Sequence, residues 1–138
     1  MNVVLDTNVF LVILPENSIY HPVYKALYQG KYNLVLSHQI LLEYEEQFSL
    51  RYKTPIAAKI IEGLVNNNNF IFCDPRFLFN LIYHDPDDNK FVDCAVAGNA
   101  DYIVTNDRHF DVLKSIDFPS VNCITLQEFQ KILYPDFL

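Results

Sequence analysis

The sequence predicts one α/β domain over residues 1–138, built on a central, mostly parallel sheet of four to five strands. Apolar runs rich in valine, isoleucine and leucine recur without polar alternation, which is typical of parallel strands covered on both faces. Segments of helical period separate these runs, and this alternation favours helices packed on a parallel sheet through right-handed crossovers. A chain of 138 residues, 51% of them hydrophobic, is long enough for one buried core.

The expected strands are five apolar runs that end in polar residues or turns. The first, Asn2 to Leu5, stops at Asp6-Thr7-Asn8, as a buried strand leading into a polar loop does. The other four are Asn33 to Ser37, Phe70 to Cys73, Asp101 to Asn106 and Val121 to Ile124.

The expected helices lie between and after these strands. They are His21 to Gln29, Gln39 to Tyr52, Pro55 to Val65, Asn89 to Ala100, Asp107 to Ser115 and Leu126 to Leu133. The second and third follow each other directly, so we expect a helical hairpin after the second strand, with Pro55 in the first turn of its second helix.

Composition indicates a cytoplasmic protein. The three cysteines are widely spaced, with no zinc-binding pattern, and are expected to be buried thiols in a reducing compartment. The N-terminus has no basic start of a secretory signal, and the apolar run from Val9 to Leu14 is too short to span a bilayer. We therefore expect no membrane contact.

The acidic residues are concentrated in one part of the chain. The formal net charge is −7, yet nine of the 17 acids lie between residues 74 and 117. A negative protein is a poor partner for nucleic acid unless bound cations change the local charge, as divalent metal ions would. The charge therefore does not exclude a nucleic-acid substrate.

Two aspartates are expected at the edge of the sheet where ligands bind. Asp6 closes the first strand and Asp107 follows the strand that ends at Asn106. If these strands are neighbours, the two carboxylates face one crevice and repel each other unless cations lie between them. Such hard oxygen ligands suit Mg²⁺ or Mn²⁺. The alternative is that each aspartate only caps the helix that follows it.

Glu43 is the third candidate. It lies on the expected helix beside an apolar stripe of Ile40, Tyr44 and Phe48, at the border of the buried face. Taken alone, it would be a boundary residue, and only the other acids give it significance.

The segment Asp85-Pro86-Asp87-Asp88-Asn89-Lys90 contains three acids and stands at the start of an expected helix. Asp88 is either a metal ligand at the helix start or the N-cap of that helix after an Asp-Pro turn. An EF-hand loop is excluded because lysine holds the position of its glycine. The roles of Asp85 and Asp87 stay open. Asp93 is expected to be solvated rather than supporting a site, and His84 and His109 are expected to be ordinary surface residues.

The four acids and the order of strands and helices around them resemble those of the PIN-domain nucleases, in particular the bacterial VapC-like group of toxin components of toxin–antitoxin systems. The resemblance covers nearly the whole chain and is carried by Val4-Leu5-Asp6-Thr7-Asn8-Val9, by Glu43, by Asp88 before Ala95, and by Thr105-Asn106-Asp107. Spacing within the family favours Asp88 over Asp93 as the third acid. Asn106 departs from the glycine that this group often has there.

The resemblance implies a three-layer α/β/α PIN-like domain and a metal-dependent endoribonuclease. Asp6, Glu43, Asp88 and Asp107 would hold one or two Mg²⁺ or Mn²⁺ ions, and Thr105 would orient a water or a phosphate. Single-stranded RNA, an antitoxin protein and a second copy of the chain are the expected partners. Basic residues that could contact phosphates, unless they are simply solvated, are Arg51, Lys53, Lys59, Arg76, Lys90 and Arg108. Two other functions stay open: a non-catalytic PIN-fold interaction protein, and a metal-dependent phosphatase acting on a small substrate.

Overall fold

A five-stranded sheet forms the centre of the molecule. The computed structural model describes residues 1–83 and 85–136. The strand order is β3-β2-β1-β4-β5, and every pairing is parallel. The predicted parallel sheet is therefore confirmed, with strands somewhat shorter than the apolar runs: β1 (Asn2–Leu5), β2 (Asn33–Leu36), β3 (Phe70–Phe72), β4 (Tyr102–Val104) and β5 (Cys123–Ile124).

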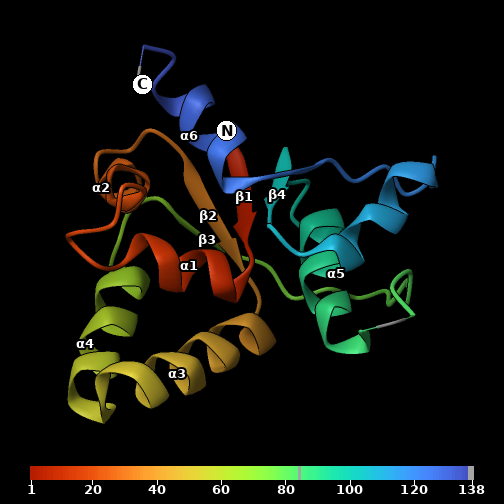
Figure 1. Ribbon diagram of the computed structural model, residues 1–138. Helices are drawn as coiled ribbons and strands as arrows, with labels where there is room; N and C mark the ends of the chain where they lie inside the picture. Colours follow the sequence, from red (N-terminus) through yellow and green to blue (C-terminus); the bar gives the residue numbers. More distant parts are fainter. Residues whose placement is uncertain (84, 137–138) are drawn as a thin grey trace.

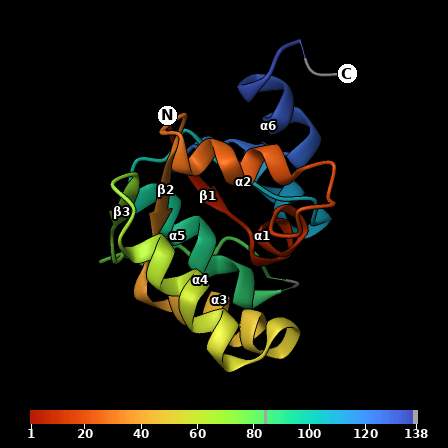
Figure 2. The same ribbon diagram turned by 90° about the vertical axis from the view of Figure 1, so that its left-hand side faces the viewer.

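Helices cover both faces of this sheet, as the three-layer prediction requires (Figures 1 and 2). In Figure 1, α1 (Thr7–Ile13), α2 (His21–Tyr28) and α4 (Thr54–Val65) lie to the left of the sheet, and α3 (His38–Tyr52) runs below it. To the right lie α5 (Asn89–Ala97) and the 3-10 helix η2 (Arg108–Ser115). The last helix, α6 (Leu126–Leu133), contacts α2. Within the described ranges, no helix is long and apolar enough to cross a membrane.

Local sequence explains where several helices begin. The hydroxyl of Ser37 accepts a hydrogen bond from the backbone N–H of Ile40 at 3.2 Å and so caps α3. Thr125 and Glu128 form a reciprocal capping box at the start of α6. The predicted helical hairpin is confirmed, since α3 and α4 pack together with Pro55 in the first turn of α4.

One α-helix was not predicted. The loop expected at Thr7 and Asn8 is instead the first turn of α1, which begins directly after Asp6. Its residues Thr7, Val9, Phe10, Leu11 and Ile13 are all buried, so the sequence shows no polar face from which a helical period could be read.

Gly98 lies where α5 meets the sheet, and it has no room for a side chain. A Cβ atom there would lie 2.6 Å from Cγ1 of the buried Val35 and 3.2 Å from the carbonyl oxygen of Cys94. We expect Gly98→Ala to lower the free energy of unfolding by about 1–3 kcal/mol through overpacking, measured by urea denaturation. Gly63→Ala in α4 is the matched control, because its nearest atom is the movable hydroxyl of Tyr28; there we expect no loss. Equal stability of both variants would contradict the packing argument.

Candidate metal site

The carboxyl ends of β1 and β4 bring the first two candidates together. The two strands are neighbours with Leu5 opposite Val104, as the sequence argument required. The backbone N–H of Asp6 donates to the carbonyl of Val104 at 3.1 Å, which continues the pairing to the strand end. Asp6 and Asp107 line one cavity of about 280 Å³.

Thr105 links these two aspartates. Its hydroxyl donates a hydrogen bond to Oδ2 of Asp6 at 2.9 Å and accepts one from the backbone N–H of Asp107 at 3.0 Å. Asp6 and Thr105 are each only 5% exposed. Burial raises the pKa of Asp6, the hydrogen bond from Thr105 opposes this shift, and the negative charges of Asp107 and Glu43 add to it. The Asp6 carboxylate is therefore fixed in place at an electrostatic cost.

Asp107 fulfils the capping alternative as well. Its Oδ1 accepts a hydrogen bond from the backbone N–H of His109 at 2.8 Å, at the start of η2. Its side chain remains 30% exposed, so capping does not remove it from solvent.

Asp88 ends a short 3-10 helix, η1 (Pro86–Asp88), directly before α5. Asp88 occupies the N-cap position of α5, as the capping alternative expected, but its side chain makes no capping hydrogen bond to that helix. Among the described residues, no hydrogen-bond partner reaches its buried Oδ2 atom. Burial raises the pKa of Asp88 to about 7, and the charges of Asp85, Asp6 and Asp107 contribute to this rise. A buried carboxylate oxygen of this kind is a ready ligand for a cation.

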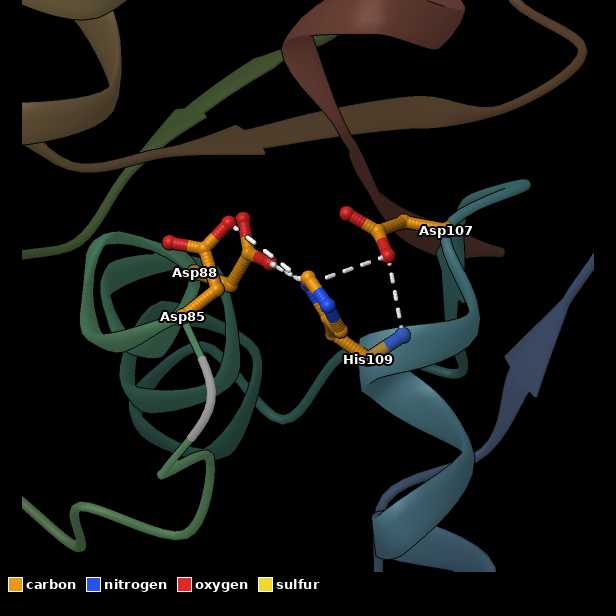
Figure 3. A group of neighbouring side chains, drawn as sticks. All are labelled: Asp85, Asp88, Asp107 and His109. Carbon is orange, nitrogen blue, oxygen red and sulfur yellow. Dashed lines mark hydrogen bonds and ion pairs between the residues drawn. The ribbon is translucent and has the colours of Figure 1, made fainter.

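His109 lies between the acids of two segments, as Figure 3 shows. Its Nδ1 atom is 3.4 Å from Oδ1 of Asp107, 3.6 Å from Oδ2 of Asp85 and 3.9 Å from Oδ2 of Asp88. One ligand atom from each of these four residues lies within 4.8 Å of the others. The expectation that His109 is an ordinary surface residue missed this grouping, although its position two residues after Asp107 was a signal. His84, for which the same was expected, lies outside the described residues.

Glu43 is held from both sides. Its Oε2 accepts a hydrogen bond from the hydroxyl of Thr7, and its Oε1 forms a 2.6 Å ion pair with Nζ of Lys90. With 22% of its side chain exposed, it lies at the border of the buried face as expected. Glu43 and Lys90 line a polar cavity of about 620 Å³ next to α5. Lys90, a candidate for phosphate contacts, thus has a carboxylate partner in this structure.

The expectation that Asp93 is solvated is wrong. Asp93 is 3% exposed, and its Oδ1 accepts a hydrogen bond from the backbone N–H of Phe79 at 3.0 Å. Burial raises the pKa of Asp93. The hydrogen bond from Phe79 ties the segment before α5 to that helix.

The residues present fit a divalent cation. Asp6, Asp88 and Asp107 come from separate elements. The charge of Asp107 raises the pKa of both Asp6 and Asp88, and that of Asp6 raises the pKa of Asp88, so a positive charge among them would relieve repulsion. Carboxylate oxygens are the ligands that Mg²⁺ and Mn²⁺ prefer, and one of them, Oδ2 of Asp88, is buried without a hydrogen-bond partner among the described residues.

Comparison with known proteins agrees with this fold. A family model described as a PIN domain matches residues 2–109. The structure is similar to VapBC2 from Rickettsia felis bound to a DNA fragment from its promoter, with 18% identity, a TM-score of 0.63, and coverage of 91% of this chain and 98% of that one. It is also similar to DNA-bound VapBC from Salmonella typhimurium, with 13% identity, a TM-score of 0.59 and the same coverage. A search of curated proteins found no match.

Proposed function

The chain belongs to the PIN-domain family, and from this premise we propose that it is an Mg²⁺- or Mn²⁺-dependent endoribonuclease that hydrolyses phosphodiester bonds in single-stranded RNA. The observation that carries the proposal is the position of Asp107, which lines one cavity with Asp6 and has a ligand atom within 4.8 Å of one from Asp88. Repulsion among these carboxylates lowers stability and serves no purpose in a fold that binds no cation.

In this proposal each acid of the set has a role. Asp6 is the central ligand, Asp88 and Asp107 complete the group, and Glu43 binds directly or through water. A divalent cation held there would lower the pKa of a water and stabilise negative charge on the phosphate. Asp6 and Thr105 act as a fixed pair, because the hydroxyl of Thr105 holds the Oδ2 atom of Asp6 in place.

The remaining side chains support this arrangement. Thr7 and Lys90 orient Glu43, so its carboxylate stays beside the start of α1. Arg108 directly follows Asp107 and is exposed, which makes it the nearest candidate in sequence for a contact with a phosphate of the substrate.

The same proposal extends to the biological role. Both structural neighbours named above are VapBC assemblies, and their fold is that of this chain. We therefore propose a toxin component of a toxin–antitoxin system, controlled by an antitoxin protein, with a homodimer as the expected assembly. Copurification with the product of a neighbouring gene would test this role separately from catalysis.

The test of the proposed activity is cleavage of an end-labelled single-stranded RNA. We expect internal cuts with Mn²⁺ or Mg²⁺ and none with EDTA, because the acids alone cannot neutralise the developing charge. Single-stranded DNA and p-nitrophenyl phosphate are assayed in parallel. Hydrolysis of the monoester with no effect on RNA would replace the proposal with the phosphatase, and cation binding without turnover of any substrate would favour the interaction protein.

A further inference from the structure

The ring of His109 lies between Asp107 on one side and Asp85 and Asp88 on the other, with its Nδ1 atom close to all three carboxylates. Figure 3 shows its ring between the carboxylate of Asp107, which belongs to its own segment, and the two carboxylates that precede α5. The side chain of Asp88 is 12% exposed, whereas those of Asp107, Asp85 and His109 are 30%, 38% and 46% exposed. The group is thus buried at one end and open to solvent at the other.

The separations suit atoms that share one ion. Ligands at about 2.1 Å from a cation in octahedral geometry lie roughly 3 Å apart when adjacent and 4.2 Å apart when opposite. The Nδ1 atom of His109 lies 3.4–3.9 Å from its three carboxylate neighbours, within that range. Direct charge-assisted hydrogen bonds would be shorter, at about 2.7–2.9 Å.

A second observation points to a ligand at the same place. The Oδ2 atom of Asp88 that faces His109 is the buried oxygen with no hydrogen-bond partner among the described residues. An oxygen of this kind is normally satisfied by water or an ion. The nitrogen of His109 and the oxygens of Asp85 and Asp107 surround the space that this oxygen faces.

We propose that His109 is a further ligand of the cation, through Nδ1, and that this nitrogen makes the site prefer Mn²⁺ over Mg²⁺. The inference rests on the proposed function, since it concerns the same divalent cation. Both ions prefer oxygen ligands, but Mg²⁺ gives up its waters reluctantly, whereas Mn²⁺, a first-row transition metal, accepts an imidazole nitrogen more readily. A site of carboxylates alone would discriminate less between the two ions.

The experiment measures cation binding, not turnover. Isothermal titration gives the Kd of Mn²⁺ and of Mg²⁺ for the wild type, for His109→Gln, and for His38→Gln as the matched control. His38 is exposed and pairs with Asp74, away from the acidic group. We expect His109→Gln to raise the Kd of Mn²⁺ by about tenfold or more, with little change for Mg²⁺, and His38→Gln to change neither.

A spectrum of the histidine side chains gives a second readout. On addition of Mn²⁺, the ring resonances of His109 should broaden before those of His38. Equal Mn²⁺ affinity in wild type and His109→Gln, or a ring of His109 that is unaffected by Mn²⁺, would overturn the inference while leaving the metal site in place. Failure of the wild type to bind either cation would overturn the proposed function instead.

Discussion

Replacement of Asp6 by asparagine is expected to reduce metal-dependent RNA cleavage by about 10²–10³-fold or more, the loss typical when a group that stabilises developing charge is removed. The amide of the new side chain would keep an oxygen for the hydrogen bond from Thr105 but lose the negative charge. The rate of cleavage of the labelled RNA at saturating Mn²⁺ measures this effect.

The free energy of unfolding of Asp6→Asn shows whether a loss of cleavage comes from a damaged metal site or from a protein that no longer folds. The pKa of Asp6 is raised, mainly by burial, so its charged form destabilises the metal-free protein and Asp6→Asn should be at least as stable as the wild type. Asp117→Asn is the matched control, because Asp117 is exposed and outside the acidic group. Full cleavage by a folded Asp6→Asn protein would remove Asp6 from the centre of the site.

The sequence was sufficient for the sheet and for the edge that carries the site. Runs such as Asn33 to Leu36 are apolar at nearly every position because parallel strands are covered on both faces, and this signal needs no knowledge of the rest of the chain. Asp6 and Asp107 could be placed together because parallel strands all end at one edge, and β1 and β4 prove to be neighbours.

What the sequence could not provide depends on distant contacts. Helix α1 has no visible period because nearly all of it is buried. The environment of Asp93 is set by Phe79, in a segment without regular structure, and that of Glu43 by Thr7 and Lys90 from two other elements. His109 joins the acidic group because η2 turns its side chain towards Asp85 and Asp88. Apart from the closeness of His109 to Asp107 in the sequence, none of these pairings has a local pattern.

Asp88→Asn is expected to change how the stability of the metal-free protein depends on pH. The folded pKa of Asp88 is about 7, above its ordinary value of 3.8, so the folded state binds this proton more tightly than the unfolded chain does. The associated stability is fully present below about pH 4, is lost as the pH rises towards 7, and stays absent above that. The variant carries no such proton, and its free energy of unfolding should therefore fall less over this range.

The pKa shift of Asp88 and its partial exposure set the size of this difference in stability. Each pKa unit corresponds to about 1.4 kcal/mol of unfolding free energy, but solvent at the open end of the group reduces the effect. Between pH 5 and pH 8 we therefore expect the wild type to lose on the order of 2 kcal/mol more than the variant. Urea denaturation with EDTA at the two pH values measures it.

Asp87→Asn is the control, because Asp87 is exposed in the same short helix. Some slope will remain in the variant, since burial also raises the pKa of Asp6 and of Asp93. Parallel pH profiles for wild type and Asp88→Asn would mean that neither burial nor the neighbouring acids raise the pKa of Asp88 in solution, and the electrostatic argument for a cation at this site would fail.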